Sequence, residues 1–166
     1  MFGNALEFLE IERDAWRAFE ALEGVSDAQL DVRPEAAHGW SGRDLMAHML
    51  AWQAVALEIA RELAVGETST TMARVDADWD ARGGEVVNAE IQATWAVLPM
   101  DELRRRFREQ AGELRGTLTV VPEARWIKHP THMKAILEET LDHYEDHQRD
   151  LEAILDAAAT GRAERA

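Results

Sequence analysis

Apolar residues recur at intervals of three and four along most of this chain, and no stretch shows the alternation typical of a β-strand. Such spacing places apolar side chains on one face of an α-helix. The pattern predicts helices over about residues 3–23, 41–66, 85–121 and 132–157, the third interrupted at Pro99. We therefore expect an all-α fold built as a four-helix bundle.

Residues that favour helix ends support these boundaries. Ser41 and Asp44 have the spacing of a capping box, Thr131 is placed to cap the last helix, and Pro122 marks a stop. Residues 66–83 are rich in Thr, Asp and Gly and poor in apolar periodicity, which predicts a long connection, either a crossover or a lid, between the second and third helices. We expect one domain over residues 1–166, with a polar tail from about residue 158.

The composition is that of a globular protein. The chain has 166 residues, of which 46% are hydrophobic and 30% charged, and it lacks an apolar run of the length that crosses a bilayer. No secretory signal is visible at the amino terminus, so we expect a cytoplasmic protein without membrane contact. The absence of cysteine excludes disulfides, thiolate nucleophiles and thiolate zinc sites. Thiol chemistry would need a soluble thiol as cosubstrate.

The net charge of −14 disfavours binding to phosphate backbones, so we expect no nucleic-acid partner. The one basic run, Arg104 to Arg106, is followed by Glu109 and Glu113. This spacing is typical of a solvated helix face with intrahelical ion pairs.

Three histidines are the strongest indication of chemistry. His143 and His147 are four residues apart in a predicted helix, and His48 lies in another. Imidazoles four apart share a helix face, and a third from a facing helix would complete three of the four positions of a tetrahedral metal site. The alternative is that each histidine is a hydrogen-bonded residue at the edge of the core. Three histidines suit Zn, Ni, Cu and Fe alike.

Helical geometry places all three histidines beside the apolar stripes of their helices, where a bundle can open to solvent. Trp52, Tyr144 and Gln148 are candidate pocket residues there, although tryptophan and tyrosine at such positions are more often part of the core. No residue is identified as a general base, and the catalytic residues are unknown.

Other catalytic patterns are absent. A zinc-protease helix needs Glu directly after its first His, whereas Tyr144 follows His143 here. No Gly-x-Ser-x-Gly sequence is present, and Gly83-Gly84 lacks the surroundings of a phosphate-binding loop.

Two motifs together resemble a known family. The segment Gly39-Trp40-Ser41-Gly42-Arg43-Asp44-Leu45-Met46-Ala47-His48 is followed near the carboxyl end by His143-x-x-x-His147. Two segments that lie between these motifs add to the likeness: Val87-Asn88-Ala89 and Leu98-Pro99-Met100-Asp101-Glu102-Leu103. In this order they resemble the DinB-like, or YfiT-like, metalloenzymes, which include mycothiol-dependent maleylpyruvate isomerase and bacillithiol transferases.

The resemblance implies a four-helix bundle of DinB type with a long crossover between helices 2 and 3. It also implies a divalent metal, most often zinc or nickel, on His48, His143 and His147. The isomerase has a carboxylate among its ligands, so histidine at all three positions favours the transferase-like branch. An exogenous low-molecular-weight thiol, such as mycothiol or bacillithiol, is then an expected cosubstrate.

Two classes of function therefore compete. The first is a metal-dependent S-transferase or hydrolase that activates a thiol or a water for attack on a small electrophile. The alternative is a non-catalytic stress-response or small-molecule-binding bundle. A structural homodimer is also compatible with the sequence, because Trp16 or Trp95 could anchor an interface, although both positions fit the core equally well.

Overall fold

The computed structural model describes the backbone of residues 2–163 and the side-chain environments of residues 2–160. All regular structure in this part of the chain is helical, which confirms the all-α prediction. The longer helices are α1 (Ala5–Trp16), α3 (Gly42–Val65), α4 (Thr70–Arg82), α5 (Gly84–Ala96), α6 (Met100–Leu118), α7 (Pro130–Glu138) and α9 (Gln148–Ala163). The shorter ones are η1 (Phe19–Gly24), α2 (Asp27–Leu30), η2 (Glu35–Ala37), η3 (Glu123–Arg125) and α8 (Leu141–Asp146).

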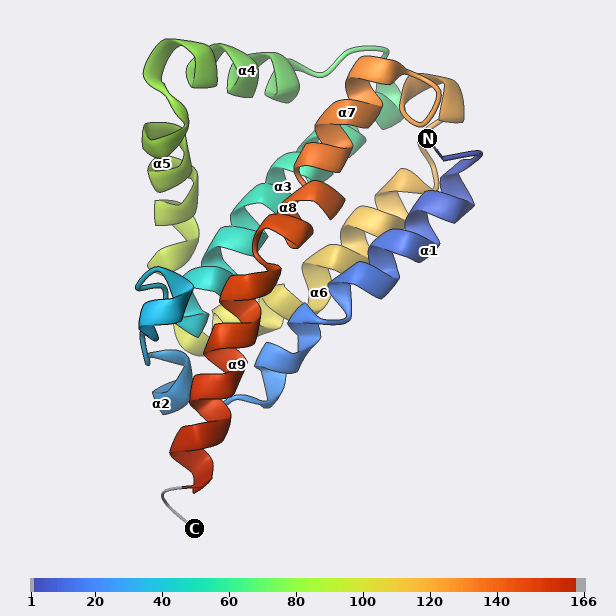
Figure 1. Ribbon diagram of the computed structural model, residues 1–166. Helices are drawn as coiled ribbons and strands as arrows, with labels where there is room; N and C mark the ends of the chain where they lie inside the picture. Colours follow the sequence, from blue (N-terminus) through green and yellow to red (C-terminus); the bar gives the residue numbers. More distant parts are fainter. Residues whose placement is uncertain (1, 164–166) are drawn as a thin grey trace.

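Helix α3 occupies the middle of the molecule and packs most extensively against α6 (Figure 1). Helices α7, α8 and α9 follow one another in a line that runs opposite in direction to α3. Helix α1 lies beside α6 and also contacts α8. Helices α4 and α5 form an arm on the outer side of α3, away from α1. The two elements that carry the histidines, α3 and α8, therefore face each other.

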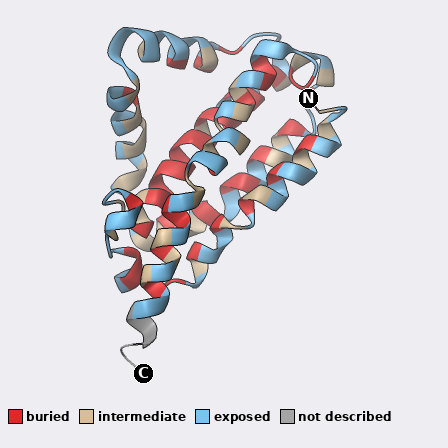
Figure 2. Cartoon of the chain, viewed as in Figure 1, coloured by how far each residue is buried: buried red, intermediate tan, exposed pale blue. Residues whose placement is uncertain are grey.

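Buried residues line the inward faces of these helices, and exposed residues cover the outside (Figure 2). Trp16 illustrates the pattern, because it is 2% exposed and packs against Phe19, Phe107 and Tyr144. Trp95 is partly buried against the same core. Trp16 is thus a core residue and cannot anchor a dimer interface.

The start of α3 follows from the predicted capping box. The Ser41 hydroxyl accepts a hydrogen bond from the Asp44 amide, and the Asp44 carboxylate accepts one from the Ser41 amide. The next residue, Gly42, allows close packing, because a Cβ atom there would lie 2.5 Å from Leu30. The capping box is confirmed, and it sets where the helix that carries His48 begins.

The long connection expected over residues 66–83 is not irregular, because most of it forms α4. Ser69 caps this helix by accepting a hydrogen bond from the Met72 amide. The Glu62 carboxylate at the end of α3 accepts hydrogen bonds from Ser69 and Thr71, which fix the turn between the two helices. Only Thr71 and Val75 of α4 are buried, so the helix has little apolar periodicity to reveal it.

The expected single helix over residues 132–157 is also divided, into α7, α8 and α9. At the first break the buried Thr140 hydroxyl donates a hydrogen bond back to the Ile136 carbonyl, an interaction that bends helices. At the second break His147 follows the last residue of α8 as its C-cap and has a non-helical conformation. The final helix continues to Ala163, so the polar tail expected from residue 158 is helical as far as the structure describes it; residues 164–166 lie outside the described residues.

Two surface properties agree with the sequence. Arg105 and Arg106 each pair with Glu102 of the same helix, as expected for a solvated helix face, whereas Arg104 is largely buried and pairs with Asp27 of α2. None of the described helices combines the length and the apolar character needed to cross a membrane.

Candidate metal centre

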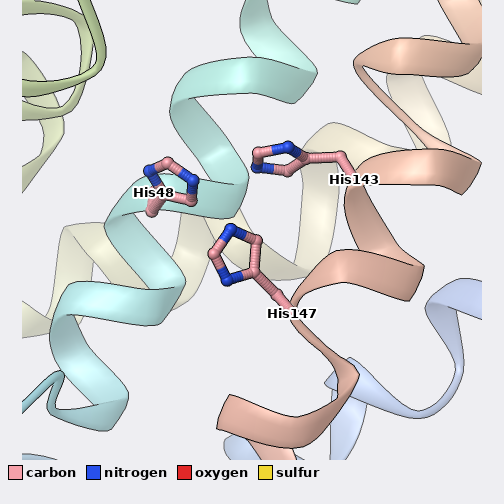
Figure 3. A group of neighbouring side chains, drawn as sticks. All are labelled: His48, His143 and His147. Carbon is pink, nitrogen blue, oxygen red and sulfur yellow. The ribbon is translucent and has the colours of Figure 1, made fainter. Parts of the chain in front are cut away.

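His48, His143 and His147 come together between α3 and the end of α8, with their rings turned toward one another (Figure 3). One potential ligand nitrogen from each ring lies within 4.8 Å of those of the other two. The three ring centroids are 4.7 to 4.8 Å apart. The structure thus brings the three predicted histidines into one cluster.

Two of these rings have a buried nitrogen without a hydrogen-bond partner: Nδ1 of His48 and Nε2 of His143. A buried polar atom without a partner is costly and is usually satisfied by a ligand, an ion or a water. Burial, followed by the nearby His147 ring, lowers the pKa of His48 to about 3. Burial, followed by His48 and His147, lowers the pKa of His143 to about 2. Both rings are therefore neutral near pH 7, as metal ligation requires.

His147 is oriented by Asp150, whose Oδ2 lies 2.9 Å from its Nδ1. The other oxygen of this buried carboxylate lies 2.9 Å from Nδ1 of His38. Burial opposes ionisation of Asp150, but the two histidine contacts hold its pKa below the usual value. With Nδ1 of His147 directed at the carboxylate, Nε2 is left for a ligand, which is the usual arrangement of metal-binding histidines.

Tryptophans enclose the cluster. Trp40 stacks on His147 at a centroid distance of 5.3 Å and meets His48 edge to face at 4.7 Å. The ring centroid of Trp52 lies 6.0 Å from that of His143, and Nε1 of Trp52 donates a hydrogen bond to Oδ1 of Asn88 on α5. These contacts restrict the imidazole rings and reduce their access to water.

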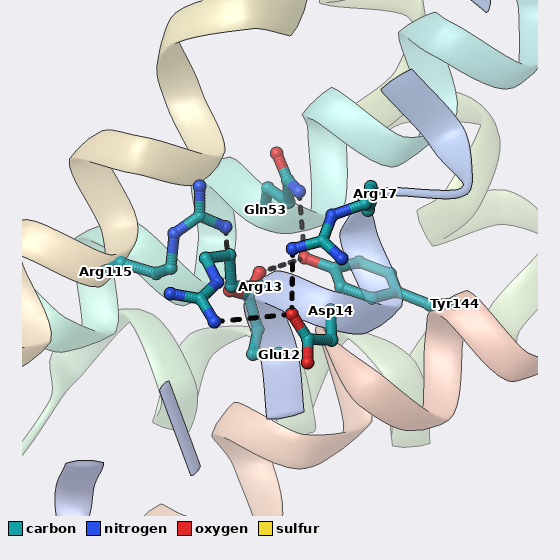
Figure 4. Close-up of polar contacts among 7 residues, drawn as sticks. All are labelled: Glu12, Arg13, Asp14, Arg17, Gln53, Arg115 and Tyr144. Atoms are coloured by element: carbon teal, nitrogen blue, oxygen red, sulfur yellow. Dashed lines mark hydrogen bonds and ion pairs between the residues drawn. The ribbon is translucent and has the colours of Figure 1, made fainter. Parts of the chain in front are cut away.

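The side chain between the two histidines of α8 anchors that helix in the core (Figure 4). The Tyr144 hydroxyl donates to Oε1 of Glu12 at 2.9 Å and accepts from Nε2 of Gln53 at 2.8 Å. Arg115 donates to the other oxygen of Glu12 at 2.9 Å. This network joins α8 to α1, α3 and α6, and so holds the backbone that carries His143.

The candidate pocket residues lie in different surroundings. Trp52 lines the cleft above the histidines, Tyr144 is buried in the core as described, and Gln148 donates to Glu152 at the surface of α9. The cleft has a volume of about 1130 Å³. Glu139 also lines it, and burial, followed by the charges of Glu138 and Asp76, raises the pKa of this carboxyl to about 8. Glu139 is therefore mostly protonated at pH 7.

The donor set fits a divalent transition metal. Three imidazoles that line a cleft, with His48 and His143 neutral near pH 7 and His147 oriented by a carboxylate, are ligands that suit zinc or nickel. The family model of the DinB superfamily matches residues 9–151. The chain belongs to the DinB superfamily. No curated protein and no solved structure showed significant similarity to it.

Membership in the DinB superfamily confirms the family resemblance seen in the motifs. Two residues that shape the centre were not predicted from the sequence as part of the site: Trp40 and Asp150. A signal exists for each, because Trp40 belongs to the motif that leads into α3, and Asp150 follows His147 by three residues, so that it lies on the same helix face.

Proposed function

We propose that this DinB-superfamily protein is a divalent-metal-dependent enzyme in which His48, His143 and His147 hold the ion, with zinc or nickel preferred. The observation that carries the proposal is the pair of unpartnered buried nitrogens on His48 and His143 beside a His147 ring oriented by Asp150. A purely structural role would leave two buried polar atoms without partners, at a cost of about 1–3 kcal/mol each.

The proposed reaction class is transfer of a small electrophile to a low-molecular-weight thiol, or its hydrolysis. A divalent ion supplies Lewis acidity, which lowers the pKa of a thiol or water that ligates it. Burial keeps His48 and His143 neutral, Asp150 orients His147, and Trp40 and Trp52 exclude bulk water. Glu139, protonated near pH 7, is a candidate proton donor at the cleft wall.

We further propose that the chain is a single domain with a DinB-type four-helix bundle. The four helices of that bundle correspond to α1, α3, α6 and the consecutive helices α7–α9. In this interpretation α4 and α5 take the place of the expected crossover. The antiparallel arrangement of α3 and α7–α9 supports the proposal, because it brings His48 level with the histidines of α8.

The test is metal content of untagged protein, measured by elemental mass spectrometry. We expect about one zinc or nickel ion per chain, lost in both the His48→Ala and His143→Ala variants. His129→Asn is the matched control, because His129 lies outside the cluster and asparagine can also cap α7. A protein that takes up neither metal after incubation, or whose variants keep the ion, would refute the proposal and favour the non-catalytic binding bundle.

A further inference from the structure

The cleft above the histidines has a strongly acidic wall. Seven acidic side chains line it, of which Glu139 is mostly protonated at pH 7, and Lys134 is the one cationic side chain among its described lining residues. Nζ of Lys134 is already paired with Glu138 at 2.9 Å. In the part of the chain that the structure describes, none of the other six acidic side chains forms an ion pair. The seven residues are Asp76, Asp80, Glu85, Glu138, Glu139, Asp142 and Asp146.

These acids come from both sides of the cleft. Asp76 and Asp80 belong to α4, which forms part of the outer arm, whereas Asp142 and Asp146 belong to the helix that carries His143. A concave surface lined by one sign of charge focuses the electrostatic potential and attracts ions of the opposite sign. A cation that enters the cleft is therefore stabilised from two directions.

The same cleft presents aromatic faces. Trp40, Trp52 and Trp79 all line it, and the rings of Trp52 and Trp79 meet edge to face at 6.0 Å. Trp79 is 45% exposed, yet it is held in place, because a Cβ atom on Gly84 would lie 2.5 Å from its ring. Indole faces bind ammonium and guanidinium groups, and carboxylates around them strengthen the attraction.

An independent feature marks the floor of the cleft as a ligand site. His48 is 3% exposed, lines the cleft, and has an unpartnered Nδ1. A bound molecule could place its reactive group at the histidines and its charged group between the tryptophans and the acidic side chains. The cleft volume of about 1130 Å³ has room for such a molecule.

We propose that the substrate is an organic cation, in which an ammonium group lies against Trp79 and Trp52 beside Asp76 and Asp80 while an electrophilic group reaches the three histidines. This inference rests on the metal-dependent function proposed above, and it names the substrate class of that site. The acidic wall of the cleft disfavours an anionic cosubstrate. The molecule that attacks the electrophile is therefore water, or a thiol that has no net negative charge.

The test compares choline with its uncharged isostere 3,3-dimethylbutan-1-ol. Binding is measured by tryptophan fluorescence and by calorimetry, on both metal-free and zinc-loaded protein. We expect saturable binding of choline with a dissociation constant about tenfold or more below that of the isostere. Binding should weaken between about 0.1 M and about 1 M NaCl, over which the Debye length falls from about 10 Å to about 3 Å.

Variants locate the interaction. The double variant Asp76→Asn/Asp80→Asn and the single variant Trp79→Leu should each weaken choline binding about three- to tenfold, whereas Trp79→Phe should keep most of it. Asp76, Asp80 and Trp79 are all exposed, so the variants should fold, which circular dichroism checks. The matched control is Glu10→Gln/Glu20→Gln, which changes the net charge equally at exposed positions outside the cleft. It should leave choline binding unchanged.

Equal affinity for choline and its isostere, no binding of either, or an equal loss in the control variant would each overturn the inference. These outcomes are separate from those of the metal measurement. Protein that holds zinc on the three histidines without a preference for choline would retain the proposed function and lose the substrate class. Protein that prefers choline but takes up no metal would retain a cation-binding cleft and lose the proposed enzyme.

Discussion

Replacing Tyr144 by phenylalanine removes one oxygen atom from a buried polar network and leaves the packing of the ring unchanged. The hydroxyl is the donor to Glu12 and the acceptor from Gln53, and these two side chains are 1% and 0% exposed. Burial raises the pKa of Glu12 in spite of its contacts with Arg115 and Tyr144, so this carboxyl already lies in an unfavourable environment. Loss of one of its partners should therefore be costly.

The magnitude follows from the two hydrogen bonds that are lost. A buried donor or acceptor left without a partner costs about 1–3 kcal/mol, and water cannot easily replace the hydroxyl at this depth. Gln53 is the more affected residue, because its Oε1 is already unpartnered and Tyr144→Phe would leave its Nε2 unpartnered too. We expect a total loss of about 3 kcal/mol, which corresponds to a fall of about 6–12 °C in Tm for a chain of this size.

The assay is thermal and urea unfolding followed by circular dichroism, on metal-free protein so that ligand binding does not contribute. Thr119→Ala is the control, because its hydroxyl makes one hydrogen bond at an exposed position and should change Tm little. In a double-mutant cycle, Tyr144→Phe combined with Gln53→Met should lose at least about 1 kcal/mol less than the sum of the single variants. A fall in Tm below about 2 °C for Tyr144→Phe, or strict additivity in the cycle, would show that the network does not stabilise the fold as described.

Three further predictions concern the centre and its scaffold. Asp150→Asn should weaken zinc affinity about 10- to 100-fold, because His147 loses its orienting carboxylate. Competition with a chelating dye measures this affinity. An equal loss of zinc affinity in the control variant Glu152→Gln, at the surface of α9, would contradict this account. Glu139→Gln should stabilise the protein above about pH 8 and have little effect near pH 4.5. The folded pKa of Glu139 is raised, so the stability contributed by its neutral form is complete below the unfolded pKa of 4.5 and is lost as pH rises to about 8. Because the Glu139 side chain is partly exposed, we expect the free energy of urea unfolding of Glu139→Gln to exceed that of the unchanged protein by about 2 kcal/mol at high pH. A stabilisation by Glu139→Gln that grows toward low pH would contradict the direction of this pKa shift. Gly42→Ala should cost about 1–3 kcal/mol in the same assay, because the added methyl group would lie 2.5 Å from Leu30; a neutral effect would mean that α2 shifts freely.

Local signals in the sequence account for much of the fold. The apolar spacing predicts the helical class, and Ser41 with Asp44 predicts the start of α3, because a cap needs only residues three apart. The spacing of His143 and His147 predicts that they share a face for the same local reason. Helix α4 escaped prediction because it is an exposed helix, and its hydrogen bonds from Ser69 and Thr71 to Glu62 depend on the path of the chain. The bend at Thr140 likewise depends on burial of one hydroxyl.

The sequence alone therefore determined the helical class, the start of α3, the proximity of His143 and His147, and the family. Only the tertiary structure decided that His48 meets that pair, that Asp150 orients His147, and that Trp40 covers the cluster, because each of these contacts depends on how helices distant in sequence pack. The acidic aromatic cleft has the same origin. A net charge of −14 says how many carboxylates are in excess, but only the packing of α4 and α5 against α3, opposite α7 and α8, gathers seven acidic side chains around one site.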